Sequence, residues 1–378
     1  MKRAVIAGYA RSPFTLARKG ALRSVRPDDL ATAVVRGLLE KTGIEPADIE
    51  DLVIGCAFPE GEQGFNIGRM VALMAGLPES VGGVTVNRYC GSSMTSIHMA
   101  VGSIAAGAGD VFICAGVESM TRIPIMGFNP IPNAEFANTH PDAYLGMGDT
   151  AENVATRWQI PRADQEAFAV ASQAKAAAAQ ARGNLSDEIV VIDGPSGTIA
   201  EDGCPRPGTT LEALAGLKPA FNQAGSVTAG TSSPLTDGAA ATLVCSEDYA
   251  MAHGLPVLAR IRSIAVAGCS PAIMGIGPVG ASTKALKRAG LSAGDIAVTE
   301  LNEAFASQAI ACIRDLDLDP EKVNLDGGAI ALGHPLGATG ARITGKAASL
   351  LKREGGEFAL ASQCIGGGQG IATILEAV

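Results

Sequence analysis

The chain has 378 residues, of which 47% are hydrophobic and 18% are charged, and its formal net charge is −9. A chain of this length is usually too long to fold around one hydrophobic core, so we expect two or three domains. The composition excludes a largely disordered chain. The negative charge and an aromatic content of only 4% argue against nucleic acid as the main partner, although a few local cations or amides would still hold a phosphate-bearing ligand.

The first apolar run, residues 4–10, ends at Arg11 and Pro13. It is too short for a signal sequence or a membrane span and predicts a strand, either edge or central. No later run is long enough to cross a bilayer. The eight cysteines form no C-x-x-C pair. In a chain of this length they indicate free thiols in a reducing compartment, and we expect the cytoplasm.

The sequence repeats itself at a shift of 247 positions. Residues 43–49 (GIEPADI) recur as residues 290–296 (GLSAGDI), and each copy follows a helix-like stretch and precedes a strand-like one. At the same shift, the apolar strand 111–115 corresponds to 358–362. Short apolar strands that alternate with helices predict two related α/β halves, each a mainly parallel sheet covered by helices.

A different kind of sequence separates the halves. Pro- and Asn-rich turns at 124–133 precede an Ala-rich helix at 164–181 and an irregular stretch at 194–207. We expect an insertion that lies over one half and supplies a binding surface. The expected domains are an N-terminal half of residues 1–117 plus 226–255, an inserted loop domain of residues 118–225, and a C-terminal half of residues 256–378.

Cys90 stands where a strand is expected to turn into a helix. An alternating run leads into it, and apolar residues then recur at helical spacing, at Met94, Ile97, Val101 and Ile104. A cysteine at a helix N-terminus meets unpaired amides and the positive end of the helix dipole, which favour a thiolate. The alternative is a small buried hydrophobe, the usual state of a free cysteine.

Two later glycine-rich segments also carry reactive side chains. His334, one of four histidines, lies between glycines just before an expected helix, where it is either structural or a base suited to neutral pH. Cys364 follows an expected strand and precedes a glycine run whose amides would bind an oxygen, unless the run is only a bend between two strands. The GIGPVG match at 275–280 lacks the strand context and acidic partner of a dinucleotide site.

Taken together, these segments resemble the thiolase family over nearly the whole chain. Four catalytic blocks occur in the family's order and spacing. The matching pieces are RSPF (11–14), NRYC (87–90), GDTAEN (148–153), TAGTSS (228–233), NEAFA (302–306), GHP (333–335) and CIGGG (364–368).

The resemblance implies a fold of two repeated βαβαβαββ halves in α/β/α/β/α layers, with an inserted loop domain that binds coenzyme A and makes oligomer contacts. It implies a homodimer or a dimer of dimers, and leaves open a hydratase–dehydrogenase partner. Coenzyme A (CoA) and acyl-CoA are expected as substrates, with no permanently bound cofactor and no metal. The implied reaction is thiolytic cleavage of a 3-ketoacyl-CoA to acetyl-CoA and a shortened acyl-CoA, or the reverse Claisen condensation.

The family's roles transfer to matching positions. Cys90 would carry the acyl group as a thioester, His334 would take its proton, and Cys364 would move a proton at the α-carbon. Asn302, through a water, would join His334 in an oxyanion hole for the enolate, while the amides of Cys90 and Gly366 would form a second hole for the acyl-enzyme oxygen. These groups suffice for acid–base and nucleophilic catalysis without a metal.

The predictions of the thiolase subtype and of the CoA contacts rest on fewer residues. Acetyl-specific members often have Met where Gln369 stands and His where Gly146 stands, so the sequence more closely resembles the degradative 3-ketoacyl-CoA thiolases. Ser233 and Met147 are the expected CoA contacts. The alternatives are an acetoacetyl-CoA thiolase (acetyl-CoA C-acetyltransferase), a decarboxylating ketoacyl synthase and a non-catalytic acyl-CoA or lipid-binding relative. Cys364 argues against a synthase, and the complete catalytic set argues against the non-catalytic alternative.

Overall fold

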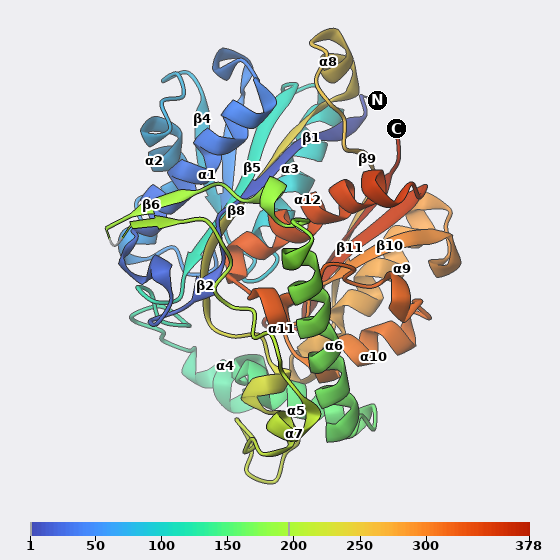
Figure 1. The fold of residues 1–378 in the computed structure, drawn as a ribbon. Helices are drawn as coiled ribbons and strands as arrows, with labels where there is room; N and C mark the ends of the chain where they lie inside the picture. The colour runs from blue at the N-terminus through green and yellow to red at the C-terminus, as the bar shows by residue number, and fades with distance from the viewer. Residues whose placement is uncertain (1, 196) are drawn as a thin grey trace.

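A ten-stranded mixed sheet runs through the molecule (Figure 1). The computed structural model describes residues 2–195 and 197–378. Within them the strand order is β10-β11-β12-β9-β1-β8-β5-β3-β4, with β2 paired to β8. The strands are β1 (Ala4–Arg11), β2 (Thr15–Leu16), β3 (Asp51–Gly55), β4 (Gly82–Val86), β5 (Val111–Ser119), β8 (Thr236–Ser246), β9 (Ala259–Gly268), β10 (Ile296–Leu301), β11 (Phe358–Ile365) and β12 (Gln369–Glu376).

The sheet consists of two parts that meet at β1 and β9. Only two residue pairs join them, Val5 with Arg260 and Ile6 with Ala259. The first apolar run of the sequence therefore forms a central strand, fully buried from Ala4 to Arg11.

Helices cover both faces of the sheet. α1 (Pro27–Thr42) and α2 (Ile67–Met74) pack on the N-terminal part, and α9 (Gly277–Ala289) and α10 (Ala306–Asp315) pack on the C-terminal part. α3 (Ser92–Ala106) and α12 (Leu336–Glu354) pack against each other and against strands of both parts. The remaining helices are α4 (Ala134–Thr139), α5 (Met147–Arg157), α6 (Arg162–Ala181), α7 (Leu211–Ala215), α8 (Glu247–Ala252) and α11 (Ala329–Leu332).

The predicted repeat is present in three dimensions. At a shift of 247, β3 corresponds to β10, β5 to β11, α1 to α9 and α3 to α12. The repeated motif begins with glycine because α1 and α9 each end on a residue in the left-handed conformation, Gly43 at φ 63° and Gly290 at φ 75°. The layered α/β fold predicted from the sequence is confirmed.

The prediction of mainly parallel sheets was wrong. β3–β4, β3–β5 and β10–β11 are parallel, but β8 runs antiparallel to β1 and β5, and β12 runs antiparallel to β9 and β11. For β12 the reason is connection length: only residues 366–368 join β11 to β12, and a parallel neighbour needs a crossover of a dozen residues or more. The stretch predicted as irregular also contains β7 (Gly197–Ile199), which pairs with β6 (Ile192–Gly194).

Residues 118–225 run from the end of β5 across one side of the molecule (Figure 1). The predicted Ala-rich helix is α6, which packs against α10 and α11 beside the C-terminal part of the sheet. α4, α5 and α7 lie together at one end of the molecule. Across the described ranges, the model has no helix that is both long and apolar enough for a bilayer span.

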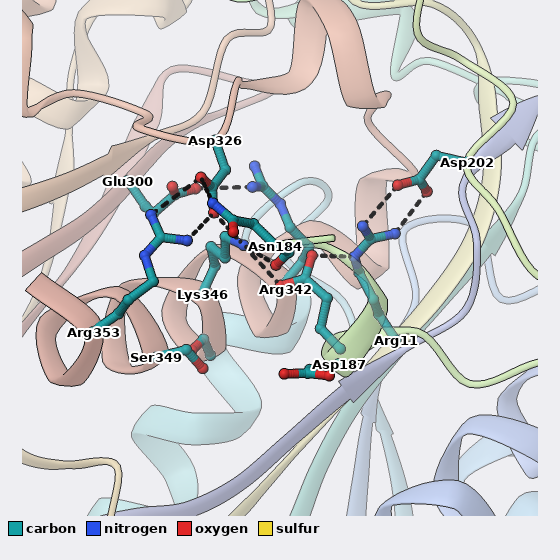
Figure 2. Close-up of polar contacts among 12 residues, drawn as sticks. Arg11, Asn184, Asp187, Asp202, Glu300, Asp326, Arg342, Lys346, Ser349 and Arg353 are labelled. Atoms are coloured by element: carbon teal, nitrogen blue, oxygen red, sulfur yellow. Dashed lines mark hydrogen bonds and ion pairs between the residues drawn. The ribbon is translucent and has the colours of Figure 1, made fainter. Parts of the chain in front are cut away.

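A buried ionic network joins the inserted segment to both halves (Figure 2). The Arg11 guanidinium on β1 donates both Nη atoms to Asp202 at 2.7 Å and its Nε to Glu188 at 2.8 Å. On α12, Lys346 lies 3.0 Å from Glu188 and 2.7 Å from Asp326. Loss of one member of a buried ion pair leaves the other charge without a partner, which costs free energy of folding. The network therefore fixes the inserted segment against the two halves.

We expect Asp202→Ala to destabilise the protein by about 3–5 kcal/mol, because it leaves the Arg11 guanidinium buried without its bidentate partner and frees the Phe14 amide. Lys2→Ala, which removes the exposed pair with Asp110, should cost less than about 1 kcal/mol. Urea denaturation of both variants measures the difference. Equal small losses would contradict a stabilising role of the network.

Candidate active site

Cys90 lies in a tight elbow between β4 and α3. Tyr89, just before it, has φ +43°, an uncommon conformation for a residue with a side chain. Local hydrogen bonds hold it: the Tyr89 amide donates to Asn87 Oδ1 at 2.8 Å, and Ser92 Oγ donates to the Tyr89 carbonyl at 2.6 Å. The predicted strand-to-helix elbow is therefore present, with the sulfur two residues ahead of the helix.

The predicted preference for a thiolate was wrong for the resting protein. Burial raises the pKa of the Cys90 thiol to about 12, although the amides of Gly366 and of Cys90 itself lower it and the charge of Glu118 adds a smaller rise. The loss of solvation outweighs the helix N-terminus because packing from the C-terminal half removes water from the elbow. The thiol therefore keeps its proton until a base removes it.

This protonation state predicts a specific pH dependence for alkylation of Cys90 by iodoacetamide. Because burial also lowers the pKa of His334 to about 3, the resting pair is thiol and neutral imidazole. The alkylation rate should therefore rise about tenfold per pH unit from pH 6 to 9, in step with the thiolate fraction. A thiolate–imidazolium pair would instead give a plateau across this range, and a plateau would contradict the assignment.

His334 precedes α12 and is oriented by three contacts. Its amide donates to Thr236 Oγ1 at 3.0 Å, and its Nδ1 lies 2.7 Å from Thr339 Oγ1. Because the Thr339 hydroxyl donates to the Pro335 carbonyl, Nδ1–H is assigned as donor, which leaves Nε2 as the acceptor atom of the ring. Asn302 Nδ2 lies 3.4 Å from this Nε2.

Asn302 is positioned next to the strand that bears Cys364. Its amide donates to the Ser362 carbonyl at 2.9 Å, and its buried Oδ1 has no partner among the described residues. Cys364 is fully buried. Burial raises the pKa of its thiol well above the ordinary value, and the neighbouring Cys90 raises it further. The site therefore holds two thiols in one low-dielectric environment.

Gly366 completes the arrangement: it lies next to Tyr89 and Met147, and its amide lowers the pKa of the Cys90 thiol. The contacts therefore link Cys90, Gly366 and Cys364 in one group and Asn302 with His334 in another. The two groups are joined through β11, where Ser362 holds Asn302 two residues before Cys364. The glycine run is indeed a bend between two strands, the alternative considered from the sequence, and it also presents an amide to the sulfur.

A buried carboxylate that sequence reasoning missed lies behind the elbow. Glu118 on β5 accepts hydrogen bonds from the Ala57 amide (2.8 Å), the Gln63 side chain (2.8 Å) and the Gly337 amide (2.9 Å). The last of these fixes the start of α12, directly after His334. Burial raises its pKa, while these hydrogen bonds lower it. A single Glu within the apolar run VFICAGVES was the available signal.

The two expected CoA contacts lie beside the same group. The Ser233 amide donates to the Ala304 carbonyl at 3.0 Å, and Met147 packs in one apolar cluster with Cys364 and Phe305. Sequence reasoning missed Phe221, a half-exposed ring that meets Phe305 edge-on at 5.9 Å. As an isolated aromatic in a polar stretch of a chain with ten phenylalanines, it was a detectable candidate.

No set of three or more His, Cys, Asp or Glu side chains in the described ranges is arranged to hold a metal ion.

Comparisons with known proteins identify the family. The model of the thiolase N-terminal domain matches residues 4–248, and that of the thiolase C-terminal domain matches residues 255–377. The chain is 48% identical to the 3-ketoacyl-CoA thiolases of Bacillus subtilis (strain 168) and Shewanella denitrificans, over 100% of both chains in each case. It also superimposes on human mitochondrial 3-ketoacyl-CoA thiolase in complex with CoA, with a TM-score of 0.92, 38% identity and coverage of 100% and 98%. The chain belongs to the thiolase family.

Proposed function

We propose that this enzyme is an acetyl-CoA C-acyltransferase that cleaves 3-ketoacyl-CoA with CoA, giving acetyl-CoA and a shortened acyl-CoA. The observation that carries the proposal is the proximity of two thiols: Cys90, half-buried in its elbow and next to the Gly366 amide, and the fully buried Cys364. A cleavage of this type needs a nucleophile for the ketone carbon and a separate proton donor for the departing carbon, and two thiols supply both. The relatives named 3-ketoacyl-CoA thiolase support the same assignment.

The first half-reaction forms a thioester. The Cys90 sulfur attacks the ketone carbon while His334 Nε2 accepts the thiol proton. The bond between the ketone carbon and the α-carbon then breaks, and its electrons form the enolate of acetyl-CoA. Asn302 and His334 donate hydrogen bonds to the enolate oxygen, and Cys364 gives its proton to the α-carbon. The high pKa of Cys364 suits this role, because the thiol is fully protonated when the enolate leaves.

The second half-reaction returns the enzyme to its resting state. The thiol of CoA gives its proton to the Cys364 thiolate and attacks the acyl carbon on Cys90. The amides of Cys90 and Gly366 hold the oxygen of the tetrahedral intermediate. The Cys90 sulfur leaves and recovers its proton from His334, so that protons and charges balance over the cycle.

We assign residues 118–225 as the domain that binds CoA, between a first half of residues 1–117 plus 226–255 and a second half of residues 256–378. Ser233 and Met147 are the proposed CoA contacts, and Phe221 is added to them. The position of all three beside Cys364 and Phe305 supports this assignment. The human relative, solved in complex with CoA, is consistent with CoA as a substrate.

We also propose that the chain forms a homodimer through β4. This strand stands at the end of the strand order, and an unpaired strand edge is a template for association. Exposed apolar side chains lie on the segments around it, at Phe65, Met70, Leu73, Tyr89 and Met99. The eight free thiols fit a reducing compartment, and we propose the cytoplasm.

A thiolysis assay tests the proposal. Purified protein, CoA and 3-ketoacyl-CoA substrates from acetoacetyl to medium chain are followed by loss of the ketoacyl signal and appearance of acetyl-CoA. Turnover that increases with chain length supports the degradative function. Turnover of acetoacetyl-CoA alone would establish an acetyl-CoA C-acetyltransferase instead. No turnover of any substrate, with Cys90 still acylated, would contradict the proposed function.

A further inference from the structure

The two cysteine-bearing segments are held together by a side chain outside the set assigned above. Gln363, directly before Cys364 on β11, donates its Nε2 to the main-chain carbonyl of Cys90 at 2.7 Å. The main chain of Gly91 also packs directly against the side chain of Ile365, so closely that a Cβ atom on Gly91 would collide with it. The elbow and the end of β11 are therefore in direct contact at the peptide that follows Cys90.

A second polar contact joins the same two segments further from the sulfur. Arg88 Nη1 donates to Gln369 Oε1 at 3.0 Å, where β12 begins. Its Nε donates to Thr95 Oγ1 at 2.9 Å, which ties it to the first turn of α3. Residues 88–91 and residues 363–369 form what we call the loop clamp.

The elbow depends on such external contacts. The left-handed conformation of Tyr89 is unfavourable for a residue with a side chain and persists only when its surroundings hold it. Gln363 fixes the peptide on the far side of Cys90. Directly after the same strand, three residues later, comes Gly366, whose amide stabilises the Cys90 thiolate. One side chain thus connects the nucleophile to the strand that presents its hydrogen-bond donor.

The burial of Gln363 indicates that this contact matters beyond packing. The residue is fully buried, and its Oε1 has no partner among the described residues. Burying an amide with an unpaired oxygen costs free energy, and an apolar side chain of similar size would avoid this cost. The hydrogen bond to the Cys90 carbonyl is the interaction that sets glutamine apart from such a residue here.

We propose that Gln363 is a positioning residue that holds the Cys90 sulfur in line with the Gly366 amide. This inference rests on the proposed function, in which that amide binds the oxygen of the acyl-enzyme. Displacement of a reacting group by about 1 Å can cost a factor on the order of 10² in rate, so loss of one clamp hydrogen bond should be measurable in the acylation step.

The test compares two buried glutamines. Gln363→Met keeps the length of the side chain but removes the donor. Gln165→Met is the matched control: Gln165 is also fully buried, donates its Nε2 to the Ile160 carbonyl at 3.2 Å and to Ser226 Oγ at 2.9 Å, and has a buried Oε1 without a partner in the described ranges. Acylation of Cys90 by acetyl-CoA should slow about 10- to 100-fold in Gln363→Met. The control should stay within about twofold of the wild-type rate, and KM for CoA should change less than about threefold in either variant.

A second readout does not depend on thiolysis. Alkylation of Cys90 by iodoacetamide at pH 8.5 should be slower in Gln363→Met, because the Gly366 amide no longer stabilises the thiolate. If that variant melts well below Gln165→Met, Gln363→Leu replaces it, since leucine is apolar and has no donor. Wild-type rates of acylation and alkylation in a folded Gln363 variant would overturn the proposal. Absence of thiolysis in the wild type would overturn the function alone, because alkylation still tests the clamp.

Discussion

Cys90→Ala is expected to lower thiolysis by a factor on the order of 10⁵ or more, because it removes the atom that carries the acyl group. The remaining oxyanion donors and bound substrate leave only a small residual rate. Mass spectrometry after incubation with acetyl-CoA should show no acylated peptide from residues 84–94. Cys245→Ala, which removes a thiol from the hydrophobic core, should retain activity and acylation at Cys90. Full turnover by the Cys90 variant would exclude the proposed intermediate.

Cys364→Ala should separate the two chemical steps. Thiolysis and condensation should be abolished, a loss of at least about 10²–10⁴, because no other group is assigned to exchange protons at the α-carbon and with the CoA thiol. Acyl transfer from acetyl-CoA to Cys90 should remain detectable, since the nucleophile, His334 and the Gly366 amide are unchanged. Rapid-quench measurement of acyl-enzyme beside steady-state thiolysis distinguishes the steps.

The outcomes for this second variant are distinct. Normal thiolysis by Cys364→Ala would remove Cys364 from the mechanism. Loss of both acylation and thiolysis, in a variant with wild-type thermal stability, would instead place Cys364 in the first step. Normal thiolysis by Cys364→Ala is unexpected. The pKa values of both thiols are raised, so both hold protons at neutral pH, and the site has few other groups that donate a proton in this range.

The periodic parts of the fold were predictable from the sequence. The repeat at 247 positions located α1, α9, β5 and β11, because hydrophobic spacing and a terminal glycine reflect local structure. Strand direction was not predictable in this way. Whether β8 and β12 run parallel or antiparallel depends on connections and partners that lie outside the local pattern.

For the candidate site, the identity of the catalytic residues was easier to predict than their protonation states. The cysteine elbow was recognisable from its flanking strand and helix, but the sign of the pKa change was not. The elbow packs against residues such as Ile365, which contacts Gly91 and lies more than 270 positions away. Glu118 and Gln363 were missed for the same reason, because their partners belong to distant segments.

The repeat also bears on how such a site is assembled. At the 247-residue shift, His334 corresponds to Asn87, Cys364 to Val117, and Cys90 to Gly337. The reactive groups therefore never occur at equivalent positions of both copies. If the halves descend from one duplicated ancestor, each has specialised: one copy supplies the nucleophile, the other the acid–base groups. Neither half alone has a complete set, so a gene fragment encoding one of them would carry no selectable activity, and the two copies are bound to evolve as a single unit.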